Sequence, residues 1–240
     1  MQTLMLLASP ALIARAPSLQ RSRGSRALLS MADKPPLFLD EEAALAASSF
    51  PISPDELISK TRAWALSNNG VEEPSMLADS FQFVGPVVGP LGKDEYLEAV
   101  GGFNIYEAFP DLSPRLYDFR ADPYEPGRVW YTSRVTGTFS GPFANGAIQP
   151  TGKGFEMPPE AISVTWNAEG KATKFTIGVC MDRSVGDSEG LGGIFGILYA
   201  VGRPFPFREA NPWRKSLGFK LFDIVGNLAQ AAQRKQASSD

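Results

Sequence analysis

The side chains that the sequence lacks limit its chemistry as much as those that it contains. None of the 240 residues is histidine, and Cys180 is the only cysteine. Histidine-assisted nucleophilic triads, histidine-ligated zinc or iron, cysteine metal clusters and intrachain disulfides are therefore excluded for this sequence. Acid–base chemistry is left to Asp, Glu, Tyr, Lys or a water molecule that Arg orients.

Asp182 is the first candidate for a site residue, because it ends the last strand that the sequence predicts and stands beside Arg183. It could act as a general base if it faced a cavity and were partly desolvated. The alternative is a surface or helix-capping carboxylate, a role that Asp often takes at the start of a helix. The sequence favours this alternative.

Tyr106 and Arg134 are the other two candidates. Tyr106 comes near the end of a predicted helix and could donate a hydrogen bond to a developing oxyanion, or it could be a half-buried packing residue. Arg134 could bind a carboxylate or phosphate through two parallel hydrogen bonds. Equally, Arg134 could face solvent or pair with Glu156 on the neighbouring strand, and the sequence leaves both alternatives open.

The charge is unevenly distributed along the chain. The net charge is −3, yet residues 1–32 contain four arginines and no acidic residue. This composition predicts a targeting peptide, with a tail of no targeting role as the alternative. The apolar stretch Thr3–Ala14 before the arginines suits a plastid reached through the secretory route, with the mitochondrion as second choice. The acidic remainder is a poor candidate for binding nucleic acid.

Three consecutive segments are typical of strands in an antiparallel meander: Arg128–Ser140, Lys153–Trp166 and Lys171–Asp182. Glycine, proline and asparagine separate these runs of β-branched and aromatic residues, as expected for turns. In the first segment Trp130, Thr132, Arg134, Thr136 and Thr138 share one face, and Val129, Tyr131, Ser133 and Val135 share the other. Both faces are mixed, so the alternation does not identify the one that lines a cavity.

Helices are predicted before and after the meander. Ser53, Pro54 and Glu56 form a capping box at the start of the first helix. A short helix over Glu73–Ser80, a strand over Phe81–Val84 and a helix over Gly92–Ala108 follow. A last helix covers Trp213 to about Lys235, and its apolar stripe and basic residues could rest on a membrane surface or bind a partner. The favoured alternative is that it packs back over the domain.

The order of these parts resembles the NTF2-like superfamily, and within it the SnoaL-like group. The resemblance covers about residues 53–202 and rests on weak motifs in the right order: "LADSFQFVGP", Phe109–Leu112, Arg134–Thr138, Pro150–Lys153, Asn167–Lys171, and Asp182 followed by Leu191–Gly202. It implies an α+β cone, in which a curved antiparallel sheet wraps around the first helices and leaves a pocket at the open end. It also implies an acid–base aspartate in that pocket and a homodimer formed through the outer sheet face.

The predicted organisation is a targeting peptide over 1–32, a linker over 33–52, the NTF2-like domain over 53–202 and a helical extension over 203–240. Two functions fit it. One is a non-catalytic protein of the plastid that binds a small apolar ligand or serves in assembly. The other is a SnoaL-like cyclase or isomerase that acts by proton transfer without a cofactor, with Asp182 as acid–base group, Tyr106 as oxyanion donor and Arg134 as anchor. The sequence favours the first, and a pocket with two inward-facing ionisable groups would reverse that order.

Overall fold

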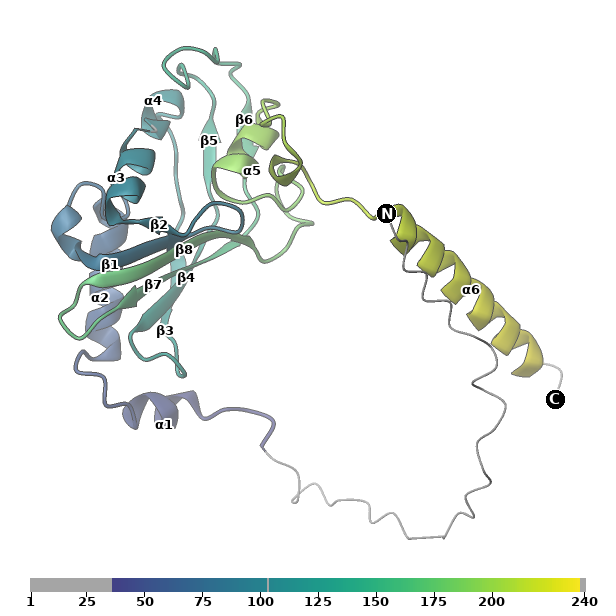
Figure 1. The fold of residues 1–240 in the computed structure, drawn as a ribbon, viewed down its shortest axis with the longest axis horizontal. Coiled ribbons are helices and arrows are strands. Elements are labelled where there is room, and N and C mark those ends of the chain that lie inside the picture. Colours follow the sequence, from purple (N-terminus) through teal and green to yellow (C-terminus); the bar gives the residue numbers. More distant parts are fainter. Residues whose placement is uncertain (1–35, 103, 238–240) are drawn as a thin grey trace, which may run out of the picture. The chain divides into compact units, whose positions relative to one another are not determined.

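The predicted meander forms the middle of a six-stranded sheet (Figure 1). The computed structural model describes residues 36–102 and 104–237, and the elements below belong to a unit formed by residues 40–240. The strands of the sheet, in spatial order, are β2 (Leu91–Gly92), β1 (Leu77–Val84), β8 (Ala172–Cys180), β7 (Glu160–Trp166), β4 (Arg128–Ser133) and β3 (Tyr117–Ala121). The predicted α+β class with a curved sheet is confirmed.

The resemblance implied an antiparallel sheet, but one pair of strands in the structure is parallel. Strands β4, β7 and β8 pair antiparallel as predicted, but β1 pairs parallel with β8. A parallel pair needs a long crossover between its strands. The chain supplies one, because the helices after β1 and the strands β3 to β7 all come between the two partners in sequence.

Two of the three predicted long strands are interrupted. Arg128–Ser140 divides into β4 and β5 (Thr136–Thr138), and Lys153–Trp166 divides into β6 (Gly154–Glu156) and β7. At the second interruption lie Pro158 and Pro159, which have no N–H group to give to a sheet. The interruptions release β5 and β6 from the main sheet, and the two pair with each other as a second sheet.

The helices follow the predicted order with different bounds. They are α1 (Glu41–Ala46), α2 (Pro54–Leu66), α3 (Lys93–Gly101), α4 (Ile105–Ala108), α5 (Gly193–Ala200) and α6 (Leu217–Ala237), with short 3-10 turns η3 (Pro74–Met76) and η4 (Arg208–Ala210). The predicted cap is confirmed, since Ser53 Oγ accepts a hydrogen bond of 3.3 Å from the Glu56 amide. In contrast, α1 falls in the predicted linker, the helix expected over Gly92–Ala108 is two helices, and most of Glu73–Ser80 is not helical.

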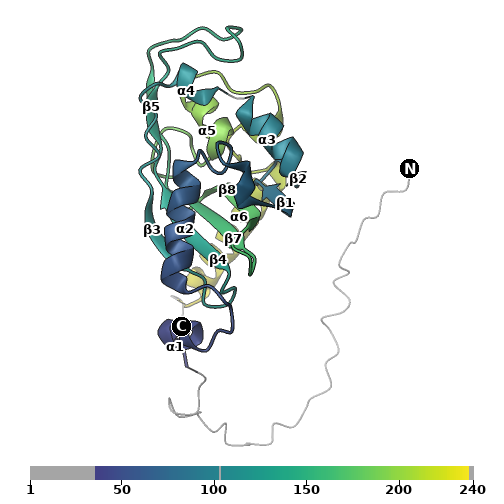
Figure 2. The same cartoon turned by 90° about the vertical axis from the view of Figure 1, so that its left-hand side faces the viewer.

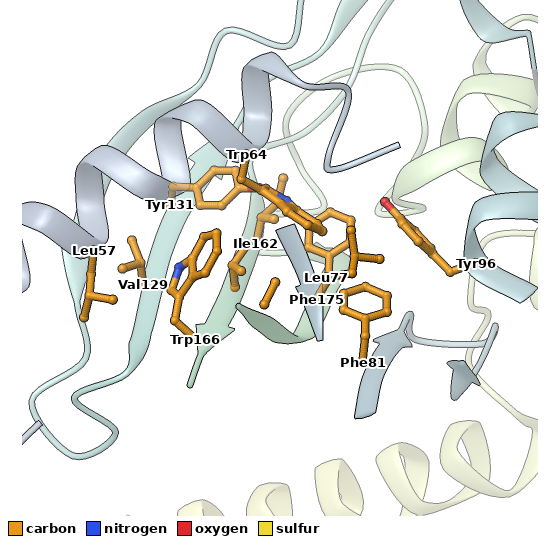
Figure 3. Close-up of a cluster of buried hydrophobic side chains, with 12 residues drawn as sticks. Leu57, Trp64, Leu77, Phe81, Tyr96, Val129, Tyr131, Ile162, Trp166 and Phe175 are labelled. Atoms are coloured by element: carbon orange, nitrogen blue, oxygen red, sulfur yellow. The ribbon is translucent and has the colours of Figure 1, made fainter. Parts of the chain in front are cut away.

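Helices α2 and α3 pack against one face of the sheet (Figure 2) and bury the main hydrophobic cluster. Figure 3 shows this cluster, in which Trp64 of α2 meets the side chains of the central strands. The Trp64 ring lies 5.4 Å from the ring of Phe175 and 6.2 Å from that of Trp166. Trp166 also donates from Nε1 to Thr61 Oγ1 at 3.0 Å, which ties the sheet to α2 by a buried hydrogen bond.

A second hydrophobic cluster lies beyond the interruptions of the strands. Its buried members are Ala108, Phe109, Phe139, Phe143, Phe155, Met157, Ile197, Leu198, Ala200 and Val201. They come from α4, α5, β6 and the segments beside these elements. The described residues of the unit therefore form two apolar centres.

Two predictions concern the ends of the chain. The targeting peptide predicted for residues 1–32 lies outside the described residues and stays a prediction. At the other end α6 spans 21 residues, and in the described part of the chain no helix reaches the length and apolarity that crossing a membrane requires.

Candidate functional site

A cavity of about 430 Å³ opens between the sheet, α3, α4 and the start of α5. Both hydrophobic clusters contribute to its wall, for example Phe83, Tyr96 and Ile162 from the first and Ile105, Met157 and Ile197 from the second. Among the described residues that line it, Glu160 is the only carboxyl, and no Lys or Arg is present. The cavity is thus an apolar chamber with one acidic group.

The strand register brings three polar side chains to the same part of this wall. Glu160 and Ser133 are direct partners across β7 and β4, and Tyr131 pairs with Ile162 two positions further along. Directly opposed residues of an antiparallel pair point to the same face, and so do residues two apart on one strand. The face of β4 that the sequence left undecided is therefore the one with Tyr131 and Ser133.

All three polar side chains are buried, each with 1% of its surface exposed. Among the residues that the structure describes, neither Tyr131 Oη nor Ser133 Oγ finds a hydrogen-bond partner. A buried hydroxyl without a partner costs about 1–3 kcal/mol, and such groups are rare in folded proteins. Two of them beside one buried carboxyl, in a cavity wall, indicate a place where a polar group of a ligand would bind.

Glu160 is set apart from the other carboxyls by its surroundings. Burial in the apolar wall raises its pKa from 4.5 to about 7, and a hydrogen bond from the Gly193 amide opposes the rise. At neutral pH the group can therefore accept or give a proton. Burial also raises the pKa of Tyr131 far above its usual range, so that its hydroxyl stays protonated and can donate a hydrogen bond.

The start of α5 closes the cavity near Glu160. The Gly193 amide donates to Glu160 Oε1 at 3.0 Å, and Gly192, Gly193, Ile194 and Phe195 all line the cavity. Gly193 has a φ of +55°, a backbone conformation that glycine adopts at little cost. This turn lets the first N–H group of the helix point at the carboxyl, so that the wall of the cavity is bonded to its acidic group.

Asp182, the acid–base candidate from the sequence, does not line the cavity. Its carboxylate is exposed and accepts hydrogen bonds from the Ser184 amide at 2.9 Å and the Ser184 hydroxyl at 2.6 Å. These bonds hold the pKa of Asp182 below its usual value. The group thus lacks both features that a base in the cavity needs, and its geometry is that of the surface carboxylate considered as the alternative.

The structure places the other two candidates differently. Tyr106 of α4 lines the cavity and is 47% exposed, which puts it at the mouth. Arg134 lies outside the cavity wall and pairs with Glu156, with 2.6 Å between Nη2 and Oε1. The pairing with Glu156 that the sequence allowed is therefore confirmed. Of the three candidates from the sequence, only Tyr106 lines the same cavity as Glu160.

The sequence analysis missed Glu160 because it read Lys153–Trp166 as one continuous strand. A signal was present, since a charged residue follows Pro158 and Pro159 and opens the apolar segment Ala161–Trp166. Recognising its place across from Ser133, however, requires the strand register, which depends on the length of the loop between the two strands.

The described residues contain no group of three or more His, Cys, Asp or Glu side chains arranged to hold a metal ion. Cys180 is opposite Glu160 across β7 and β8, but it is not part of the cavity wall. Burial raises the pKa of its thiol. The chemistry available in the wall is therefore that of one carboxyl and the hydroxyl groups near it.

Comparison with known proteins gives similarity to solved structures alone. No protein-family model matches the chain, and no curated protein matches it. A protein from Jannaschia sp., provisionally named a SnoaL-like polyketide cyclase, is 14% identical with a TM-score of 0.45, over 66% of this chain and 97% of that one. AclR from Streptomyces galilaeus, provisionally a hydroxylase, is 18% identical with a TM-score of 0.40, over 72% of this chain and 98% of that one.

A third solved structure is that of a SnoaL-like polyketide cyclase from Agrobacterium tumefaciens. It is 15% identical with a TM-score of 0.37, over 50% of this chain and 88% of that one. At these identities and TM-scores, the similarities assign neither a substrate nor a reaction to this chain.

Proposed function

We propose that the chain binds a small apolar molecule with one carbonyl group in its cavity, and that Glu160 exchanges a proton with that molecule. The observation that carries the proposal is the position of Glu160, 1% exposed and the only carboxyl among the described residues of an apolar wall. Glu160 and Tyr131 both face inward, and this reverses the order in which the sequence placed the two functions.

The roles follow from the protonation states. The ionised Glu160 removes a proton from the carbon next to the carbonyl, and the electron pair moves onto the carbonyl oxygen. Tyr131 and Ser133 donate hydrogen bonds to the resulting enolate oxygen. Their hydroxyls are free to do so, because neither has another hydrogen-bond partner among the described residues. The protonated Glu160 then returns the proton to the same carbon, which gives hydrogen exchange, or to another carbon conjugated with the enolate, which moves the double bond and gives an isomerisation.

The non-catalytic alternative shares the first step. An apolar chamber of about 430 Å³ with a few placed polar groups also suits the storage or transport of a small ligand. In that function Glu160 would only donate or accept a hydrogen bond. Binding and proton transfer are therefore measured separately.

Binding is measured with prodan, a neutral naphthalene ketone whose fluorescence moves to shorter wavelength in an apolar site. Proton transfer is measured as the exchange of α-hydrogens for deuterium in β-tetralone, a small bicyclic ketone, followed by NMR. The full chain should bind prodan and accelerate the exchange, and the rate should rise with pH through about 7 as Glu160 ionises. Glu160→Gln should keep prodan binding and lower the exchange rate at least about a hundredfold, as expected for loss of a general base.

Asp182→Asn is the matched control, because it removes the carboxyl that the sequence singled out and leaves the cavity unchanged. Equal exchange rates for this variant and the original chain would support the assignment of the base to Glu160. Binding of prodan without any acceleration of exchange would favour the non-catalytic function. An absence of both would contradict the proposal that the cavity admits an apolar ketone.

A further inference from the structure

Helix α6 carries an apolar face that is exposed along most of its length. Leu217, Leu221, Ile224, Val225 and Leu228 recur at the spacing of one helix face, and their exposed fractions range from 56% to 84%. Trp213, just before the helix, is 66% exposed. The packing of this helix over the domain, which the sequence favoured, stays a prediction, and no described residue buries these side chains. A contiguous apolar surface of this kind marks an interaction site.

One side of α6, next to the apolar stripe, is polar. Lys220, Asp223, Asn227 and Gln230 recur three and four residues apart, about a third of a turn away from the apolar stripe. Ordinary surface helices show this division too, but they bury their apolar face against a protein core. Here the two faces are both open, which is the arrangement of a helix that lies in the boundary between water and an apolar phase.

The charge of this segment is opposite to that of the rest of the chain. From Trp213 to Ala237 the sequence has five basic residues and one acidic residue, although the whole chain has a net charge of −3. The acidic residue, Asp223, is already paired with Lys215 at 3.3 Å. Lys215 also lies over the ring of Phe219, 4.8 Å from its centre. The segment therefore offers a positive surface next to an apolar one.

The sequence of α6 also indicates that its helical form depends on a covering surface. Gly218 and Gly226 stand in the helix, and a methyl group added at Gly226 would meet no atom of the described residues within 4 Å. Glycine in a helix interior costs about 1 kcal/mol relative to alanine, and no close packing at this position compensates for it. A helix of this kind gains stability when its apolar face is buried.

We propose that α6 lies on the surface of a membrane that contains anionic lipids. The apolar face enters the boundary between head groups and acyl chains, Trp213 takes the interfacial position that tryptophan prefers, and Arg214, Lys215 and Lys220 face the phosphate groups. Basic residues near an anionic leaflet add attraction to the apolar insertion. This surface would hold the cavity-bearing unit where apolar molecules concentrate.

Charge favours a lipid surface over a second copy of the chain. Two segments from Trp213 to Ala237 packed through their apolar faces would lie side by side with five basic residues each, and only one already paired acidic residue in each segment would offset them. Like charges brought together destabilise such a contact. An anionic head-group layer instead complements every basic residue of the segment.

The experiment is co-sedimentation of the full chain with vesicles of phosphatidylcholine mixed with phosphatidylglycerol, and with vesicles of phosphatidylcholine alone. The chain should sediment with the anionic vesicles. The double variant Leu221→Gln with Leu228→Gln should partition onto them at least about tenfold less, because it removes apolar insertion. Lys215→Gln with Lys220→Gln should reduce the preference for the anionic vesicles several-fold.

The matched control is Asn227→Ala with Gln230→Ala on the polar face of the same helix, which should bind as the original chain does. The arginines of residues 1–32 remain in every variant, so a difference in vesicle binding between variants comes from α6. Equal vesicle binding by the Leu221→Gln, Leu228→Gln variant and the original chain would overturn the proposal.

Two further measurements identify other occupants of the apolar face. If the leucine variant changes a dimer into a monomer in sedimentation equilibrium and vesicles bind neither protein, a second copy covers the helix and the proposal is wrong. If the variant instead lowers the unfolding temperature of the chain without vesicles, α6 packs on its own domain and the proposal is equally wrong.

Discussion

Glu160 and Asp182 are carboxyls two positions apart across the β7–β8 pairing, since Glu160 opposes Cys180. Burial in an apolar wall raises the pKa of Glu160 to about 7, whereas hydrogen bonds from Ser184 lower that of the exposed Asp182. In the sequence the two residues look alike, because each is a carboxyl at the end of a strand. Their different exposure to solvent decides which of the two can act as a base near neutral pH, and this exposure cannot be predicted from the residue type alone.

The raised pKa of Glu160 predicts a particular dependence of stability on pH. Between about pH 4.5 and about pH 7 the folded state keeps a proton that the unfolded chain has released, so the free energy of unfolding falls as pH rises through this window. The loss should approach about 3 kcal/mol, and Glu160→Gln should remove it. Urea unfolding of both proteins at about pH 5 and about pH 8 measures the difference.

Asp182→Asn serves as the comparison in the same experiment. A carboxyl with a lowered pKa contributes stability above its ordinary pKa and loses it as pH falls through the lowered value, so this variant should not change the slope in the window of Glu160. A slope that persists in Glu160→Gln would contradict the assignment.

The unpartnered hydroxyls of the cavity make a second prediction. Ser133→Ala should leave the free energy of unfolding unchanged or raise it by up to about 1 kcal/mol, because the buried Oγ has no partner among the described residues. Thr61→Val should lower it by about 1–3 kcal/mol, since Thr61 Oγ1 donates to the Leu57 carbonyl and accepts from Trp166. Chemical unfolding compares the two, and a loss in Ser133→Ala as large as in Thr61→Val would mean that the serine is satisfied.

At the scale of elements, local sequence signals predicted the start of the first long helix and the pairing of the central strands. They did not predict where helices and strands are interrupted. The capping signal at Ser53 and Glu56 involves residues three apart, and Ser53 caps a helix that begins at Pro54 as predicted. The meander of β4, β7 and β8 follows from turn residues and β-branched runs. After the division of α3 from α4, and of β4 from β5, the chain contributes Ala108, Phe109 and Phe139 to the second hydrophobic cluster. Such packing involves residues far apart in sequence, which periodicity alone does not reveal.

Two glycines test how closely the helices are packed. A methyl group at Gly196 of α5 would lie 2.2 Å from Met157 Cε and 2.3 Å from the Leu191 carbonyl, so Gly196→Ala should destabilise the fold by about 1–3 kcal/mol. A methyl group at Gly226 of α6 would have no neighbour within 4 Å in the described part of the chain, and Gly226→Ala should raise helix content without lowering stability. Circular dichroism and thermal unfolding provide both numbers. Equal stability of the two variants would show that α5 is more loosely held than its contacts indicate.

At the scale of the whole molecule, the cavity joins two apolar centres. Members of both hydrophobic clusters form its wall, so a ligand in it would contact both at once. An α+β architecture of this kind was predictable from the order of elements. The cavity volume and the partners of its polar groups were not, because they depend on side chains that meet only in the folded state. The homodimer implied by the resemblance stays a prediction.

A bound ligand should therefore stabilise the unit as a whole. Prodan at about a hundred times its dissociation constant should raise the free energy of unfolding by about 2.7 kcal/mol, the value that mass action sets. Near-ultraviolet and far-ultraviolet circular dichroism should report one shared transition that moves to higher temperature. Separate transitions, of which only one responds to prodan, would mean that the ligand contacts one cluster alone.

The hydrogen bond from the Gly193 amide to Glu160 has a consequence for timing. A charged carboxylate accepts a stronger hydrogen bond than a neutral acid does. While Glu160 is ionised it holds the first turn of α5 tightly, and while it carries a proton taken from a bound molecule it holds that turn less tightly. In the proposed reaction, the transfer of a proton to Glu160 would thus also weaken the hydrogen bond between Glu160 and α5. The cavity wall would be held least tightly while the bound molecule is deprotonated.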